Sequence, residues 1–211
     1  MGNFSVSCNA PFRNSLSHLR LSAEQAFQDF SAPLRGLCKN SRDRAIIAAL
    51  SHELRASEAS ALNVEHWSGK LLMVHRSKGQ NVSAGPLSRE ARSHLEAYLE
   101  WRQQGGMFEP LPESPMFLAQ DPKSAGQRLG YKGLHRMVKK LGAIAGVEDL
   151  NPHRFRHTFG TEVTRRGVDP LFGKELMGIK SDRVFQRYTK GVFKQAAAEA
   201  YLKAIGEDEN L

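Results

Sequence analysis

Helix-start signals in the second half of the chain constrain its fold more than any other sequence feature. Asn151-Pro152 and Asp169-Pro170 each place a capping side chain before a proline that suits the first helical position. Apolar residues recur at helical spacing just upstream, over residues 134–145. The second half is therefore predicted to consist of helices.

The first half combines helices with a small antiparallel sheet. Two short strands, at 71–74 and around Val82, are separated by the turn residues 77–81, which place Lys78 at the tip of a β-hairpin. A helix capped by Ser88 follows. The predicted fold class is α+β, mostly helical, with a small antiparallel sheet or hairpin.

The positive charge of the chain is concentrated in one segment. Among 211 residues, 30 Lys and Arg stand against 22 Asp and Glu, which gives a net charge of +8. Residues 123–190 hold fifteen Lys and Arg and six Asp and Glu, while the rest of the chain is nearly neutral. A basic segment is often only a solvated face, but this concentration favours a polyanionic partner, and nucleic acid is the first candidate.

Cysteine count and hydropathy exclude several classes of protein. Only Cys8 and Cys38 are present, without a CxxC pair, so a disulfide scaffold and a cysteine-rich zinc site are excluded. No apolar run reaches the length of a membrane span, and the N-terminus lacks the pattern of a signal peptide. We therefore expect a cytoplasmic protein without a membrane segment.

The segment that begins at Asn151 groups three basic side chains. Because the Asn151 cap fixes the helix start, His153, Arg156 and His157 lie on one helical face. A helix N-terminus also attracts anions, so a phosphate fits this face. A plain polar face with one core histidine explains the segment equally well. A metal site is the weaker alternative, because Arg154 stands where a zinc protease has Glu, and no third ligand is evident.

Around this segment the sequence resembles the catalytic domain of the tyrosine recombinases, the phage-integrase family, over roughly residues 41–190. Separate motifs stand in the order that the family has, with similar gaps, which makes the resemblance specific. The motifs are Glu53-Leu54-Arg55-Ala56-Ser57-Glu58, Lys78 in the hairpin turn, His153-Arg154-Phe155-Arg156-His157, and Leu176-Met177-Gly178 followed by Arg187-Tyr188-Thr189.

The resemblance implies a phosphotyrosine reaction on DNA. Tyr188 would attack the phosphorus, while Arg55 and Arg156 would stabilise the charge on the phosphorane oxygens in place of a metal. His153 is the candidate acceptor for the tyrosine proton, and Lys78 could protonate the leaving 5′-oxygen. No metal or nucleotide cofactor is expected.

Supporting roles and simpler interpretations stand beside this assignment. Glu58 is expected to orient a neighbouring cation, and His157 to support the site from the same helix face as the catalytic pair. Arg55 and Glu58 could instead form a mere surface ion pair. Arg76 competes with Lys78 for the cationic role, although a guanidinium is too basic to donate the proton.

The nucleophile is assigned to one of four tyrosines. Tyr98 and Tyr201 fall on predicted helices, where core packing explains them. Tyr188 instead lies between Arg187 and Lys190, near the end of the basic segment. The assignment to Tyr188 therefore rests on its surroundings as well as on the motif.

One position departs from the family pattern. After the Leu-x-Gly of the closing motif the family usually has His, less often Trp, in contact with the scissile phosphate, and this chain has Ile179. Isoleucine cannot donate a hydrogen bond, and one lost donor at such a site costs on the order of a hundredfold in rate. Lys180 or a partner group could replace the donor, and packing against Tyr188 could survive. We therefore expect slow cleavage rather than none.

The chain is also short for the family. Residues 1–40 are expected to be an N-terminal extension, too short for the DNA-clamping domain of most relatives, and 41–211 to be the catalytic domain. A C-terminal helix is predicted at 192–205. In the family such a tail packs on the neighbouring protomer, but packing on its own core fits the sequence equally well. DNA affinity should then depend on phosphate contacts, and an accessory DNA-binding protein could assist.

The sequence thus predicts a site-specific DNA recombinase of the integrase or invertase type, working as a tetramer on double-stranded DNA. Two alternatives stay open. A type IB topoisomerase-like enzyme would nick and close DNA with the same residues but without strand exchange. A recombinase-derived DNA-binding or accessory protein would have catalysis weakened by Ile179.

Overall fold

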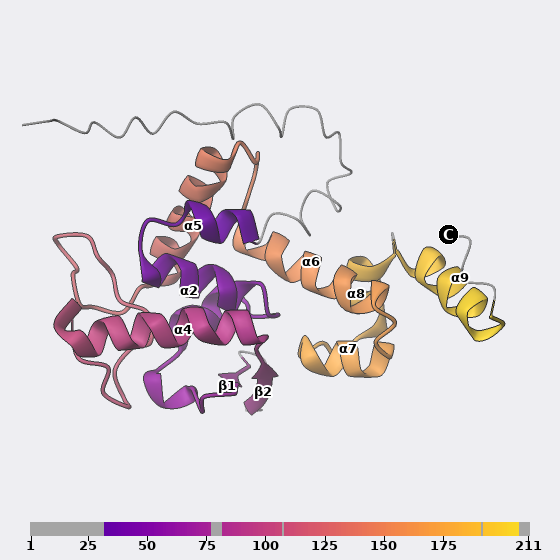
Figure 1. Ribbon diagram of the computed structural model, residues 1–211, viewed down its shortest axis with the longest axis horizontal. Coiled ribbons are helices and arrows are strands. Elements are labelled where there is room, and N and C mark those ends of the chain that lie inside the picture. Colours follow the sequence, from indigo (N-terminus) through magenta and orange to yellow (C-terminus); the bar gives the residue numbers. More distant parts are fainter. Residues whose placement is uncertain (1–31, 77–81, 107, 191, 207–211) are drawn as a thin grey trace, which may run out of the picture.

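Helices dominate the computed structural model, which describes residues 32–76, 82–106, 108–190 and 192–206. The predicted class, mostly helical α+β with a small antiparallel sheet, is confirmed (Figure 1). In chain order the named elements are α2 (Ser41–Leu50), α3 (Ala56–Ala61), β1 (Leu71–His75), β2 (Val82–Pro86), α4 (Arg89–Trp101), α5 (Tyr131–Ala145), α6 (Pro152–Arg165), α7 (Pro170–Leu176), α8 (Asp182–Thr189) and α9 (Phe193–Ala204), with a 3₁₀ turn at Val64–His66 and a π turn at Arg102–Gly106.

Side-chain caps start the helices where the sequence places them. The side-chain oxygen of Asn151 accepts hydrogen bonds from the backbone N–H groups of His153 (3.0 Å) and Arg154 (3.3 Å) at the start of α6. Asp169 caps α7 and Ser88 caps α4 in the same way. These caps satisfy backbone donors that a helix N-terminus otherwise leaves unpaired, so the starting residue of α6 is fixed.

The two strands form the predicted antiparallel hairpin. Leu72 lies opposite Gly85, and both Leu72 and Val74 of β1 are buried while their neighbours along the strand are exposed. This alternation turns one face of the hairpin toward the core. The connecting residues 77–81, and with them Lys78, lie outside the described residues.

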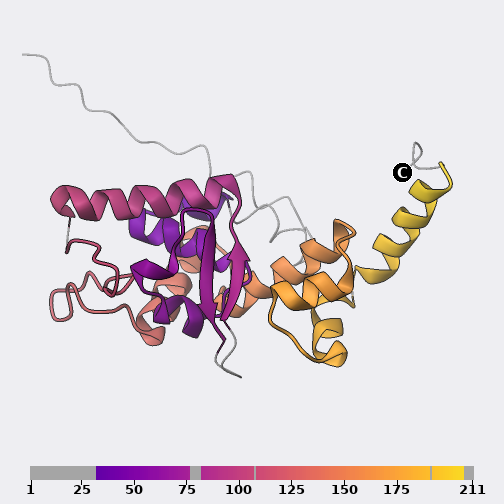
Figure 2. The same cartoon turned by 90° about the horizontal axis from the view of Figure 1, so that it is seen from below.

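The larger of two apolar cores lies between α2 and α4. Ile46, Ile47 and Leu50 of α2 are fully buried, and Leu95 and Tyr98 of α4 pack into the same cluster. Figures 1 and 2 both show α4 running alongside α2. The hairpin and α5 border this core, which makes the first body of the molecule.

A second, smaller core lies between α6, α7 and α8. Its buried members are Met177, Ile179 and Phe185, and Tyr188 packs against them. Phe155 of α6 belongs to the larger core, so α6 is shared by both. Figure 1 shows α6 running from the larger body to the group of α7 and α8. The N-terminal half of α6 therefore lies where the two cores meet.

The two tyrosines assigned to the core behave differently. Tyr98 is fully buried, and its hydroxyl accepts a hydrogen bond from the backbone N–H of Leu118 (3.3 Å). Tyr201 is 64% exposed, so its assignment to the core is wrong. The reason is that α9 projects from the rest of the molecule and buries none of its residues (Figures 1 and 2).

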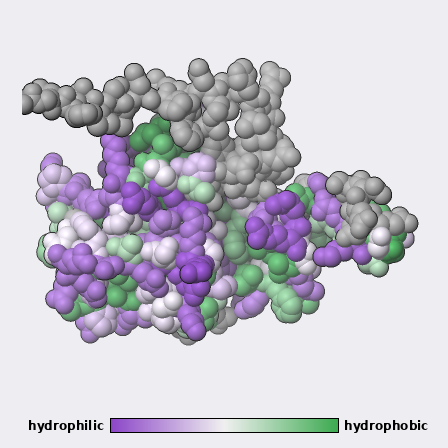
Figure 3. All heavy atoms as spheres, viewed as in Figure 1, coloured by the Kyte–Doolittle hydropathy of each residue, from purple (hydrophilic) through white to green (hydrophobic). Residues whose placement is uncertain are grey.

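The surface is hydrophilic over much of the face drawn in Figure 3, with apolar residues gathered at α7. Leu171 and Phe172 of that helix are exposed. Within the described ranges, no helix has the length and apolar character needed to cross a membrane.

Candidate active site

The ring of Tyr188 lies close to two histidines of α6. The centre of the Tyr188 ring is 5.8 Å from that of His153 and 5.6 Å from that of His157. The helix face predicted from the sequence thus meets the predicted nucleophile, although 31 residues separate His157 from Tyr188 in the chain. A neutral imidazole can accept a proton, so His153 is placed to act as a proton acceptor near the tyrosine ring.

Close packing of α8 on α6 positions Tyr188. A Cβ at Gly160 would lie only 2.9 Å from the Cβ of Tyr188, so glycine at this position permits the approach. The Thr161 hydroxyl donates a hydrogen bond to the backbone oxygen of Tyr188 (2.9 Å). Two consecutive residues of α6 therefore fix where the tyrosine enters the site.

Arg156 is anchored from behind by the backbone. Its side chain is buried and donates hydrogen bonds to the backbone oxygens of Glu53 and Met177. Burial lowers the pKa of Arg156, the charge of Arg55 lowers it further, and Glu58 and Tyr188 act in the opposite direction. An arginine starts from so high a pKa that it keeps its charge at neutral pH.

Arg55 lies beside Arg156 but reaches solvent. Its side chain is 36% exposed, whereas that of its partner Glu58 is 1% exposed. The Glu58 carboxylate accepts from the Arg55 guanidinium (2.5 Å) and from the Arg55 backbone N–H (2.9 Å). The alternative of a surface ion pair is therefore wrong, because the acid is buried and holds both the backbone and the side chain of Arg55.

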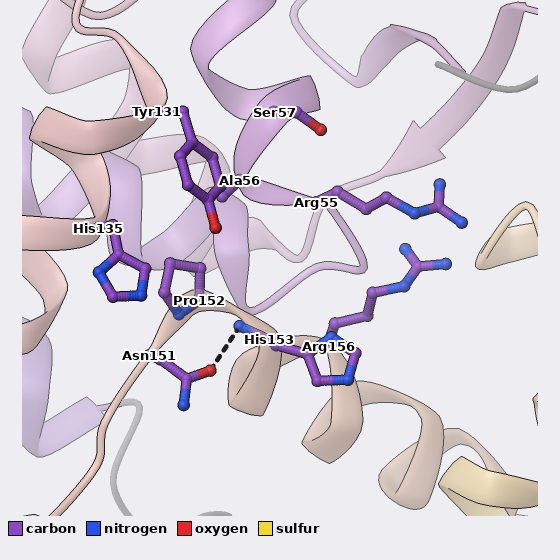
Figure 4. A pocket seen from close by; sticks show the side chains of 9 residues that line it. All are labelled: Arg55, Ala56, Ser57, Tyr131, His135, Asn151, Pro152, His153 and Arg156. Atoms are coloured by element: carbon purple, nitrogen blue, oxygen red, sulfur yellow. Dashed lines mark hydrogen bonds between the residues drawn. The ribbon is translucent and has the colours of Figure 1, made fainter.

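The two arginines border a cavity of about 210 Å³ at the N-terminus of α6. Figure 4 shows their guanidinium groups projecting side by side beyond the ring of His153, with Tyr131 and His135 on the other side of the cavity. The lining residues are Arg55, Ala56, Ser57, Tyr131, His135, Asn151, Pro152, His153 and Arg156. Tyr131 and His135 are site neighbours that the sequence motifs did not reveal, because α5 carries no part of them.

The surroundings of His153 favour its neutral form, which can accept a proton. Partial burial lowers its pKa, and the positive charges of His157, Arg156 and Arg55 lower it further. A histidine with a lowered pKa is neutral at physiological pH and can accept a proton. Within the described residues, no third His, Cys, Asp or Glu joins His153 and His157 in a metal-ligating group.

Ile179 fills the smaller core. It is 8% exposed and shares with Met177 and Phe185 the cluster against which Tyr188 packs. The expectation that packing near Tyr188 survives the change to isoleucine is thus met. Lys180, the next residue, is exposed.

Arg76 does not compete for the role given to Lys78. Its side chain is 6% exposed, and its guanidinium donates to Glu53 (3.0 Å), to Glu58 (3.1 Å) and to the backbone oxygen of Leu176 (2.8 Å). Because two buried carboxylates engage its charge, Arg76 is not a rival to Lys78 for the cationic role at the site. Sequence motifs missed these contacts because the partners are far away in the chain.

The fold is that of a tyrosine recombinase catalytic domain. The model of the phage integrase family matches residues 20–195, and the chain belongs to this family. Among curated relatives, tyrosine recombinase XerC of Thermodesulfovibrio yellowstonii is 32% identical over 80% of this chain and 56% of its own length. Tyrosine recombinase XerA of Pyrococcus horikoshii is 30% identical over 72% of this chain and 51% of its own length.

Solved structures agree with this membership. The crystal structure of XerA recombinase matches with a TM-score of 0.70 and 25% identity, covering 84% of this chain and 63% of that chain. A post-cleavage complex of XerH site-specific recombinase with difH substrate shares the fold, with a TM-score of 0.64 and 21% identity over 83% of this chain and 50% of that one. The chain thus spans only about half the length of the curated relatives it matches.

Proposed function

We propose that this protein is a site-specific recombinase that cleaves and rejoins double-stranded DNA through a 3′-phosphotyrosine formed on Tyr188. The observation that carries the proposal is the placement of the Tyr188 ring close to His153 and His157 and beside the buried guanidinium of Arg156. A nucleophile, its proton acceptor and a phosphate-binding cation then share one site. Membership of the phage integrase family supports the same reaction.

In the forward step the Tyr188 oxygen attacks the scissile phosphorus while His153 accepts the hydroxyl proton. The new bond joins phosphorus to the tyrosine oxygen, and the bond from phosphorus to the 5′-oxygen breaks. Arg55 and Arg156 offer planar donor pairs to the non-bridging oxygens, where negative charge increases in the transition state. The leaving 5′-oxygen takes a proton, for which Lys78, outside the described residues, is the proposed donor.

The reverse step restores a phosphodiester without an external energy source. A 5′-hydroxyl attacks the phosphotyrosine and gives its proton back to Lys78, the proposed donor of the forward step. The bond from phosphorus to the tyrosine oxygen breaks, and that oxygen recovers its proton from His153. Because the energy of the broken bond is kept in the phosphotyrosine, we expect no nucleotide cofactor and no metal. A 5′-hydroxyl from a second duplex gives recombination, and one from the same duplex gives simple rejoining.

Ile179 makes the reaction slow in this proposal. An isoleucine at this position offers the phosphate no hydrogen bond, so the transition state has one donor fewer than in most relatives. Lys180 is exposed next to it and is the candidate replacement. His157, whose ring centre is 5.6 Å from that of Tyr188, is proposed to keep the tyrosine ring in place.

The proposed assembly is a tetramer on two DNA sites. We assign residues 41–211 to the catalytic domain and 1–40 to an extension, with the exposed face of α9 turned toward a neighbouring protomer. DNA contacts outside this domain are assigned to an accessory DNA-binding protein. The proposed location is the reducing cytoplasm, where Cys38, a buried free cysteine, stays a thiol.

The test is covalent capture of DNA. The protein is incubated with nicked duplexes from its own genomic neighbourhood, and denaturing electrophoresis then separates protein joined to DNA from free protein. We expect an adduct with the wild-type protein and none with Tyr188→Phe. Tyr201→Phe is the matched control, because it removes the hydroxyl of an exposed tyrosine on α9 and should leave the adduct unchanged.

The adduct assay, combined with assays of DNA binding, supercoil relaxation and recombinant products, separates the alternative functions. DNA that is bound without an adduct would contradict a catalytic role and favour the accessory binder. An adduct together with relaxation of supercoils, but without recombinant products, would favour the topoisomerase-like enzyme.

A further inference from the structure

Three charged side chains are buried directly behind the two arginines of the site. Those of Glu53 and Glu58 are 1% exposed, and that of Arg76 is 6% exposed. Arg76 donates to both carboxylates, and Glu58 in turn accepts from Arg55. Charged groups are costly to bury unless they are paired, so this chain of ion pairs needs an explanation.

The guanidinium of Arg76 joins segments that are distant in the sequence. Besides the two carboxylates, it donates to the Ser83 hydroxyl of β2 (2.7 Å) and to the backbone oxygen of Leu176 at the end of α7 (2.8 Å). Gly178 permits this packing, because a Cβ there would lie 2.8 Å from the Nε of Arg76. Only a planar group with several donors can serve these partners together.

Glu53 is attached to the site in two ways. Its carboxylate holds Arg76, and its backbone oxygen accepts a hydrogen bond from the Arg156 guanidinium. Its backbone has φ +69°, in the left-handed region that an L side chain seldom adopts. The carboxylate also needs the space left by Gly85, whose Cβ would lie 2.8 Å from Oε1.

The second oxygen of the Glu53 carboxylate is buried and has no hydrogen-bond partner among the described residues. A glutamate that is buried, half-satisfied and strained destabilises the fold. Such a residue is expected where it serves function rather than stability. Its contacts with Arg76 and Arg156 indicate which function that is.

We propose that Glu53 and Arg76 are positioning residues that hold Arg55 and Arg156 in register and set the charge of the site to match one phosphodiester. The proposal rests on the function proposed above. With both carboxylates ionised, this group of two glutamates and three arginines carries one net positive charge, which a phosphodiester monoanion neutralises. The three arginines are Arg55, Arg76 and Arg156. Neither Glu53 nor Arg76 touches the cavity.

Protonation of Glu53 would change both properties. The net charge would rise by one, and Arg76 would keep Glu58 as its only charged partner. Arg76 and Arg55 would then compete for the same carboxylate, and Arg55 would lose orientation. We therefore expect DNA cleavage to be slower when Glu53 carries a proton.

The surroundings of Glu53 place this change near neutral pH. Burial raises the pKa of Glu53 to about 7; Arg76 and Arg156 lower it, and Glu58 raises it. These are the charged groups that face the carboxyl, from the segment after β1, from α6 and from α3, and β2 contributes the uncharged Gly85. Cleavage should accordingly accelerate as the pH rises through about 7.

The first test is the pH profile of adduct formation in single-turnover reactions at saturating nicked DNA. Glu53→Gln keeps the shape of the side chain but cannot ionise, so its rate should stay at the low-pH level of the wild type, about tenfold below the wild type at high pH. The change of rate with pH that comes from ionisation of His153 should remain in both the wild type and Glu53→Gln. Glu90→Gln, on an exposed partner of Arg35, is the control and should keep the wild-type profile.

If the rate of adduct formation in Glu53→Gln still rises near neutral pH, as in the wild type, the proposal is overturned. Folding is checked with Glu53→Gly, because glycine suits the positive φ and removes the backbone strain at this position. This variant should lose cleavage as Glu53→Gln does. A well-folded Glu53→Gly protein with the wild-type rate would contradict a positioning role.

The fork of Arg76 is tested by two substitutions. Arg76→Lys keeps the charge but cannot reach all partners, so it should restore little of the rate lost in Arg76→Met. Arg35→Lys, a substitution at another buried arginine, is the control and should keep the wild-type rate. A wild-type rate in Arg76→Lys would show that only the positive charge matters. It would overturn the claim that the planar guanidinium of Arg76 is needed to position the site.

A measurement without DNA separates this proposal from the proposed function. Hydrogen exchange at the Nε–H groups of Arg55 and Arg156, followed by ¹⁵N NMR, should become faster in Glu53→Gln and in Arg76→Lys. Unchanged exchange would contradict the positioning role, whatever the activity. Faster exchange in a protein whose wild type forms no adduct would uphold it and reject only the recombinase reaction.

Discussion

Individual side chains of this protein derive their roles from partners rather than from residue type. Arg55, Arg76 and Arg156 have the same guanidinium, yet one is 36% exposed at a cavity and the other two are buried against carboxylates or backbone oxygens. The sequence identified Arg55 and Arg156 by their motifs. It offered Arg76 only as a rival to Lys78 and missed its buried contacts, because the partners Glu53 and Leu176 lie 23 and 100 residues away.

The buried carboxyl of Glu53 should make stability depend on pH. Its folded-state pKa of about 7 lies above the ordinary value of 4.5, so its contribution is present below about 4.5 and is lost as the pH rises through 7. Relative to Glu53→Gln, the wild type should lose about 2–3 kcal/mol of unfolding free energy over this range. Urea unfolding of both proteins at several pH values measures this, and a constant difference would contradict it.

A single substitution at Ile179 tests whether a hydrogen-bond donor is missing from the site. Ile179→His should restore a hydrogen-bond donor near the scissile phosphate and raise the rate of adduct formation by at least about tenfold. It should also cost about 1 kcal/mol of stability, because a polar ring enters an apolar cluster. Ile179→Leu keeps volume without a donor and should keep the wild-type rate. Equal rates in both variants would show that no donor is missing here.

Among the helices and strands, the features that could be predicted from the sequence were those that depend on local signals. The caps of α4, α6 and α7 and the β-hairpin were predicted correctly, because each depends on residues close together in sequence. The wall of the cavity formed by α5 was not predicted, because Tyr131 and His135 reach α6 only through tertiary packing. The left-handed backbone of Glu53 was equally invisible, since such a φ usually indicates glycine.

The contact between α6 and α8 offers a prediction at this scale. Gly160→Ala places a methyl group 2.9 Å from the Cβ of Tyr188 and 3.1 Å from the side chain of Met177, so α8 must move away. We expect a stability loss of about 1–3 kcal/mol and about tenfold slower adduct formation. Gly36→Ala, where nothing lies within 4 Å, is the control. Adduct formation at the wild-type rate in Gly160→Ala would contradict the role of this packing.

The described part of the molecule combines a body with two apolar cores and a projecting helix, α9. Helix α9 buries none of its own residues and leaves Phe193, Tyr201 and Ile205 in solvent. The sequence predicted the helix but could not say what covers it, since an amphipathic pattern is the same for intramolecular and intermolecular packing. Among the described residues none buries this apolar face, and an exposed apolar face of this kind is typical of a contact with another molecule.

Removal of residues 192–211 should therefore separate folding from assembly. The melting temperature should change little, because no buried residue of α9 is lost. Assembly of several protomers on DNA, followed by sedimentation, should be lost together with recombinant products, while single-strand cleavage remains. A large fall in melting temperature would contradict this, since it would place the arm within the folding unit.

In the proposed reaction Tyr188 becomes joined to the 3′ end of the cleaved strand, and mapping of the adduct tests this linkage directly. The adduct on nicked DNA is digested with nuclease and protease, and mass spectrometry locates the nucleotide-bearing residue, while a kinase reaction probes the released 5′ end. We expect the peptide that contains Tyr188 to carry a 3′-linked nucleotide, and the other end to be a free 5′-hydroxyl. A nucleotide on another residue, or a 5′-linked one, would contradict the account.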